Sequence, residues 1–190
     1  MKSLRQSLHK QDLLGLGIMV VLFAVFYLLF EEEILDDYWE TNVVLILINI
    51  IMSVSLNLIN GLTGQFSIGH AGFMAVGAYT SAIITVKLGM DFPIALIVAT
   101  VSAAFLGFLI GMPTLRLNGD YLAIATLGLG EIIRIAILNI DYVGGASGFM
   151  GIPRLTTFPI AFWITVFVVY FIKNFKKYED GRACLAIREN

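Results

Sequence analysis

Residues 41–86, TNVVLILINIIMSVSLNLINGLTGQFSIGHAGFMAVGAYTSAIITV, contain no Asp, Glu, Lys or Arg. A helix that crosses a membrane needs about 20 apolar residues, so this stretch is long enough for two crossings with little left over. Near its middle, residues 60–73 (NGLTGQFSIGHAGF) are uncharged and contain four glycines. The stretch therefore predicts two membrane-spanning helices joined by a glycine-rich connection.

The composition of the whole chain supports a membrane location. Of 190 residues, 58% are hydrophobic and 14% are charged, whereas soluble domains are about 25% charged. The single cysteine, Cys184, excludes an internal disulfide. The chain has no phosphate-binding loop, since the near match that begins at Gly128 has Ile133 in place of the last glycine. We predict an all-α polytopic membrane protein that does not bind a nucleotide itself.

Apolar runs between charged segments predict six spans and a permease region over residues 1–172. The spans are residues 13–30, 43–60, 70–87, 92–112, 121–139 and 158–172. A cleavable signal peptide would be the alternative for the first run. That run is too long, and no small-residue cleavage site follows it. Residues 173–190 are polar and predict a cytoplasmic segment.

The basic residues between the spans predict the orientation. With the N-terminus inside, the inner side carries nine Lys and Arg residues and the outer side carries two, Lys87 and Arg154. The nine are Lys2, Arg5, Lys10, Arg116, Lys173, Lys176, Lys177, Arg182 and Arg188. Because cytoplasmic loops of membrane proteins are enriched in Lys and Arg, we predict a cytoplasmic N-terminus.

The glycine-rich connection predicts a broken or re-entrant segment after the second span. Irregular backbone at membrane depth is tolerated only where protein or a water-filled cavity surrounds it. Neutral polar side chains in and beside the segment suit the lining of a substrate pathway; they are Asn57, Asn60, Gln65, Ser67 and His70. For the residues that follow, 71–82, the sequence instead favours helix packing, because Ala71, Ala75, Ala78 and Ala82 share one helix face.

Two ionisable residues lie inside the fifth predicted span. Glu131 and Arg134 are three residues apart, so they share a helix face and can neutralise each other. Charged residues inside a membrane often mark a substrate path. The pair therefore predicts either a structural clamp or a pair in contact with the substrate.

An intramembrane serine hydrolase is an alternative from another functional class. The sequence GGASGF (residues 144–149) resembles the serine motif of rhomboid proteases, and His70 is the candidate base. The topology places Ser147 outside and His70 inside, whereas a nucleophile and its base must be in hydrogen-bonding contact. A hydrolase is therefore disfavoured.

Four motifs carry a resemblance to a known family. In chain order they are NLINGLTGQFSIGHAGFMAVGAY, LRLNGDYLAIATLGLGEIIRI, GGASGFMGIP and GRACLAIREN. Together they resemble the M-type permease subunits of the Liv family, which belong to ABC importers of branched-chain amino acids. The resemblance extends from about Asn42 to the end of the chain.

The resemblance implies a permease that is not an enzyme and that works in the cell (inner) membrane. Its implied partners are a related H-type permease, two ATP-binding subunits and an extracytoplasmic binding protein for leucine, isoleucine or valine. ATP would be bound by the partner subunits, and we expect no cofactor or metal in this chain and no nucleic-acid partner. Permeases for urea and short amides share the layout, so they remain an alternative.

The family's segment that docks onto the ATP-binding subunits corresponds to the end of this chain. The coupling residues that the resemblance implies are Gly181, Arg182, Ala183, Leu185, Ile187, Arg188 and Glu189. Family members continue with further spans beyond this point. We therefore expect Asn190 to lie within the coupling helix, as the end of a fragment or of a truncated reading frame.

Overall fold

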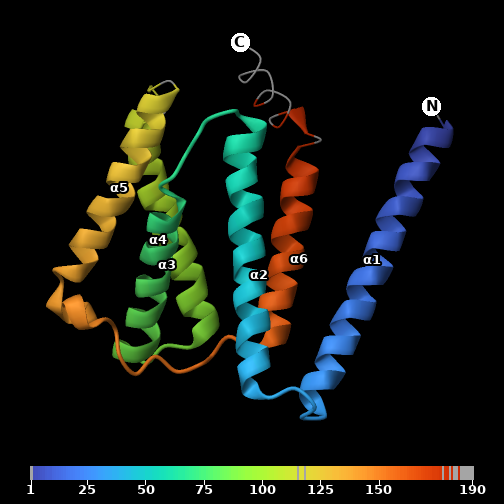
Figure 1. The fold of residues 1–190 in the computed structure, drawn as a ribbon, viewed down its shortest axis with the longest axis horizontal. Helices are drawn as coiled ribbons and strands as arrows, with labels where there is room; N and C mark the ends of the chain where they lie inside the picture. Colours follow the sequence, from blue (N-terminus) through green and yellow to red (C-terminus); the bar gives the residue numbers. More distant parts are fainter. Residues whose placement is uncertain are drawn as a thin grey trace. The chain divides into compact units, whose positions relative to one another are not determined.

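The computed structural model describes residues 2–114, 116–117, 119–176, 178–179, 181 and 184. For residues 2–14 and 16 it describes the backbone alone. The described part is helical and contains no strand (Figure 1). Its α-helices are α1 (Lys2–Glu31), α2 (Asp37–Asn57), α3 (His70–Ala82), α4 (Phe92–Thr114), α5 (Asp120–Leu138) and α6 (Phe158–Phe175). The predicted all-α fold is confirmed.

Four short turns complete the described structure. α2 continues into a π-helical turn, η1 (Leu58–Leu62), and α3 continues into another, η2 (Ile83–Lys87). Two 3-10 turns, η3 (Asp141–Val143) and η4 (Gly145–Ser147), follow α5.

Four helical segments of the described residues are long and apolar enough to cross a membrane. They are Asp37–Thr63, Phe92–Thr114, Asp120–Leu138 and Phe158–Phe175. α1 contains a shorter apolar part, Gly17–Glu31, and α3 with η2 occupies the predicted span 70–87. The chain is thus an all-α membrane protein, and crossings by all six predicted spans stay a prediction.

The chain divides into two compact units, of which the first contains residues 1–51 and 156–170. Phe158, at the start of α6, is 2% exposed and lies in its core with Val44 and Leu47 of α2. The Phe158 ring stacks against Phe23 of α1, with the ring centroids 5.9 Å apart. The backbone N–H of Phe158 donates a hydrogen bond to Glu40 Oε1 at 2.9 Å. This bond satisfies one of the N–H groups that the first turn of a helix leaves without a partner.

The second unit contains residues 52–155 and 171–190, and its α3 packs against α4 and α5 (Figure 1). Glycine allows the close approach of α3 to α5, because a Cβ atom on Gly72 would lie 3.1 Å from the Cα of Gly130. Only part of the alanine face of α3 that was predicted to pack is buried within the chain. Ala82 is buried, but Ala71 and Ala78 are exposed in the chain.

Candidate functional site

The glycine-rich connection is an irregular segment whose backbone is bonded by nearby side chains. After η1, residues 64–68 have no regular secondary structure until the turn that precedes α3. The N–H of Ser67 donates to Asn60 Oδ1 at 3.1 Å, and the N–H of Gln65 donates to Thr63 Oγ1 at 3.4 Å. These bonds satisfy backbone groups that would be costly to leave unpaired at membrane depth. The predicted break after the second helix is present.

The irregular segment is held closely against α5. The N–H of Ile68 donates to Thr126 Oγ1 at 3.1 Å. At the next residue, a Cβ atom on Gly69 would lie 3.0 Å from the carbonyl carbon of Thr126 and closer still to its oxygen. Only glycine fits there, because the backbone of α5 cannot yield as a flexible side chain would.

A pocket of about 340 Å³ lies between the irregular segment, α3, α4 and α5. Its lining is mostly apolar, with a few polar groups, and this combination is typical of small-molecule sites. Three of the predicted pathway residues, Gln65, Ser67 and His70, lie together in this lining. The residues around them are Ile59, Gly69, Phe73, Gly107, Ile110, Gly111, Thr114, Leu122, Thr126, Leu129, Gly130 and Ile133.

His70 has a partner that sequence reasoning missed. Its Nε2 lies 2.7 Å from the hydroxyl oxygen of Ser55, on α2. Ser55 also donates to the carbonyl oxygen of Met52 at 3.0 Å. A serine among many small polar residues in an uncharged helix gives no sequence signal of this contact. The hydrogen bond fixes the imidazole beside the pocket.

Two of the predicted pathway residues have contacts outside the pocket lining. Asn57 Oδ1 accepts a hydrogen bond from Lys176 Nζ at 3.4 Å. Asn60 bonds the backbone of the irregular segment, as described above. Asn60 therefore stabilises the irregular segment, and contact of either side chain with a substrate stays a prediction.

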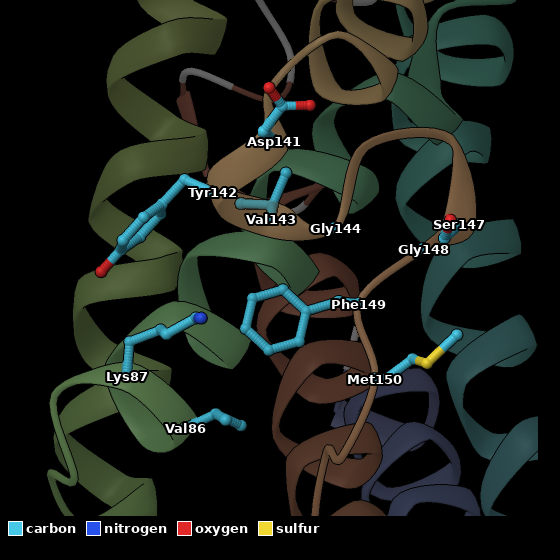
Figure 2. A pocket seen from close by; sticks show the side chains of 10 residues that line it. All are labelled: Val86, Lys87, Asp141, Tyr142, Val143, Gly144, Ser147, Gly148, Phe149 and Met150. Carbon is cyan, nitrogen blue, oxygen red and sulfur yellow. The ribbon is translucent and has the colours of Figure 1, made fainter.

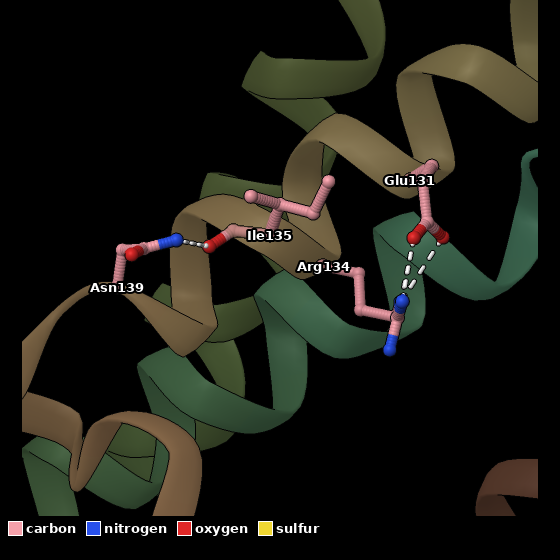
Figure 3. A network of polar contacts seen from close by, with 4 residues as sticks. All are labelled: Glu131, Arg134, Ile135 and Asn139. Carbon is pink, nitrogen blue, oxygen red and sulfur yellow. Dashed lines mark hydrogen bonds and ion pairs between the residues drawn. The ribbon is translucent and has the colours of Figure 1, made fainter.

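Glu131 and Arg134 form a bidentate ion pair on α5 (Figure 3). Arg134 Nη2 lies 2.6 Å from Glu131 Oε1, and Arg134 Nε lies 3.0 Å from Oε2. In the chain alone the side chains of Arg134 and Glu131 are 64% and 50% exposed. Neither residue lines the pocket just described, although Gly130 and Ile133 beside them do. The predicted mutual pairing is observed, and the choice between a clamp and substrate contact stays open.

Removal of Glu131 alone should harm folding more than removal of the whole pair. Glu131→Ala leaves the Arg134 guanidinium unpaired in a low-dielectric setting, whereas the double variant with Arg134→Ala removes both charges. We expect several-fold less folded, monodisperse protein from the single variant, measured by size-exclusion chromatography in detergent. A double variant that is clearly worse would instead favour a direct role of the pair in transport.

The coupling residues fall mostly beyond the part that the structure describes. Gly181 is described and buried. The other predicted coupling residues, Arg182, Ala183, Leu185, Ile187, Arg188 and Glu189, lie outside the described residues.

A second pocket, of about 310 Å³, lies between the end of η2 and the turns after α5 (Figure 2). Lys87, Asp141 and Ser147 are among its lining residues. Ser147 belongs to η4, and His70 begins α3. The turns after α5 lie at the opposite end of the α3–α5 group from the start of α3, as the topology predicts (Figure 1). The structure thus does not bring together the serine and histidine that a hydrolase would need.

A family model described as "Branched-chain amino acid transport system / permease component" matches residues 38–190. This range includes the irregular segment, the ion pair on α5 and both pockets. The chain belongs to this family. A transport permease is not a class of enzyme, and the resemblance stated from the four motifs is confirmed.

Relatives within the permease family come from bacteria and archaea. The high-affinity branched-chain amino acid transport system permease protein LivM of Escherichia coli (strain K12) is 47% identical over 119 residues. These cover 62% of this chain and 28% of the relative. The protein of the same name from Salmonella typhimurium (strain LT2) is 46% identical over 61% of this chain and 28% of its own length.

A more distant relative matches a longer part of the chain. The probable branched-chain amino acid transport permease protein LivM of Methanocaldococcus jannaschii is 28% identical over 74% of this chain and 53% of its own length. The chain thus spans between about a quarter and a half of these relatives. No solved structure shows significant similarity to it.

Proposed function

We propose that the chain is part of a permease subunit of an ABC importer that moves leucine, isoleucine or valine across the cytoplasmic membrane. The observation that carries the proposal is 47% identity to a permease named for branched-chain amino acid transport. The matched family range also contains the irregular segment and its pocket. We propose that the chain itself catalyses no reaction and that the partner subunits bind the ATP, so we expect no cofactor or metal in this chain.

The proposed partners follow from this family. They are a related H-type permease, two ATP-binding subunits that hydrolyse ATP, and an extracytoplasmic binding protein that delivers the amino acid. The excess of Lys and Arg at one side supports a cytoplasmic N-terminus in the cell (inner) membrane. The ATP-binding subunits would then dock at residues 181–189.

The substrate pathway is proposed to pass the pocket beside the irregular segment. Broken helices in transporters expose backbone groups at the substrate path. Here Gln65, Ser67 and His70 supply polar groups, and the remaining lining is mostly apolar. Such a surface suits an aliphatic side chain, and it holds no fixed charge that would retain the substrate.

The proposal can be tested directly by measuring leucine uptake into cells that express the whole importer. The complete open reading frame that contains residues 1–190 is expressed with its H-type permease, ATP-binding subunits and binding protein, in cells lacking other leucine uptake. We expect labelled leucine to accumulate above the empty-vector level, and excess valine but not urea to compete. Uptake of labelled urea alone would replace the proposal with a urea or short-amide permease, and uptake of neither would overturn both.

A further inference from the structure

The second pocket contains two opposite charges that do not pair with each other. Lys87 enters it from the end of η2, and Asp141 lines it from the first turn after α5 (Figure 2). In Figure 2 the Asp141 carboxylate points away from the Lys87 amine. Among the described residues neither side chain forms an ion pair with the other or with a third group.

Aromatic rings hold the Lys87 amine inside the pocket. Its Nζ lies 5.3 Å from the ring centroid of Tyr142 and 6.0 Å from that of Phe149. The faces of aromatic rings attract a cation, but they leave the three N–H donors of an ammonium group without strong acceptors. The described residues give these donors no carboxylate, so the amine is positioned and can still bind an anion.

We infer that this pocket binds a free amino acid with an apolar side chain, through Lys87 on its carboxylate and Asp141 on its ammonium group. A zwitterion brings its own negative and positive groups, both on one carbon atom. It can therefore satisfy both charges once the Asp141 carboxylate, which points away from Lys87 in Figure 2, turns into the pocket about its side-chain bonds. Val86, Phe149 and Met150 supply apolar surface for its side chain. The volume of about 310 Å³ is at the small end of the range of about 300–1,000 Å³ for ligand pockets.

The inference rests on the proposed function and extends it to a site that the pathway above does not use. The pocket is lined by the end of η2 and the turns after α5. These elements lie at the opposite end of the α3–α5 group from the irregular segment (Figure 1). In the proposed orientation this is the outer end. An amino acid released there would meet Lys87 and Asp141 before it reaches the pocket beside His70.

Binding of labelled leucine to the purified full-length permease in lipid nanodiscs provides the experiment. Lys87→Met should weaken leucine binding by about tenfold or more, because a charge-assisted hydrogen bond is lost. Lys87→Arg keeps the cation and should retain binding. Arg154→Met is the matched control, since it removes a cation from the loop after α5, outside the pocket lining. It should bind leucine as the unmodified protein does.

Ligand analogues separate the two charges. The carboxylate 4-methylpentanoate lacks the ammonium group, so Asp141→Asn should weaken binding of leucine but not of 4-methylpentanoate. This variant also keeps the inference falsifiable if Lys87→Met does not fold. Unchanged leucine binding in Lys87→Met would overturn the inference and leave Lys87 as an anchor at the membrane surface. If Lys87→Met does not fold, unchanged leucine binding in Asp141→Asn would overturn it instead.

Uptake by the complete system distinguishes this inference from the proposed function. A protein that transports leucine but shows no leucine binding dependent on Lys87 and Asp141 refutes the inference alone. A system that transports no branched-chain amino acid refutes the proposed function, whatever the pocket binds.

Discussion

Gly69→Ala is expected to lower the apparent melting temperature of the protein by about 2–12 °C. The added methyl group would lie 3.0 Å from the carbonyl carbon of Thr126, and this carbonyl belongs to the helical backbone of α5. Overpacking costs about 1–3 kcal/mol, occasionally more, and each 1 kcal/mol corresponds to about 2–4 °C in a chain of this size. Relief of the clash would also move Ile68 away from Thr126 and weaken their hydrogen bond.

Gly128→Ala is the matched control for this change. Gly128 lies in the same helix as Thr126, and no heavy atom lies within 4 Å of a Cβ atom added there. Alanine is favoured over glycine inside a helix by about 0.8–1.0 kcal/mol, so this variant should melt at the same temperature or slightly higher. Thermal unfolding in detergent, followed by circular dichroism, measures both variants. Equal melting temperatures would show that the irregular segment does not pack against α5 as described.

The ends of two helices agree closely with the predicted spans, whereas α1 (Lys2–Glu31) begins eleven residues before the predicted span 13–30. The predicted span 70–87 coincides with α3 and η2, and the predicted span 121–139 differs from α5 by one residue at each end. Charged, glycine and proline residues interrupt the apolar runs at these ends, and this local pattern is visible in one sequence. The break after α2 was predictable for the same reason, since glycine-rich backbone without charge is unusual at membrane depth.

Contacts between helices were harder to predict, because they depend on how each helix is rotated about its axis. The sequence predicts the alanine face of α3 as its packing surface, yet the approach to α5 uses Gly72 and Gly130. The bond between His70 and Ser55 joins two helices and has no local signal. Lys87 was read from the sequence only as a loop cation, because the rings beside it come from residues more than 50 positions away.

The turns after α5 determine the shape of the second pocket, and Gly144→Ala should open them. Gly144 has a φ of +88°, and a Cβ atom there would lie 2.7 Å from the carbonyl carbon of Gly148 and closer to its oxygen. Left-handed backbone costs a residue with a side chain roughly 1–2 kcal/mol, and the clash with backbone adds about 1–3 kcal/mol. A total of about 3 kcal/mol would accelerate hydrogen exchange in residues 139–155 by about a hundredfold, as mass spectrometry can measure.

Gly151→Ala separates the two causes of this effect. Gly151 also has a positive φ, +77°, but nothing lies within 4 Å of its added Cβ atom. It should show the conformational cost alone, with exchange about tenfold faster. The same Gly144→Ala protein should lose leucine binding if the pocket holds the amino acid, because the turn that carries Tyr142 would no longer hold its ring beside Lys87. Hydrogen exchange could instead be as slow in Gly144→Ala as in Gly151→Ala. That result would mean that the turns relax around the added methyl group. The close contact between Gly144 and Gly148 would then not be what maintains the shape of the pocket.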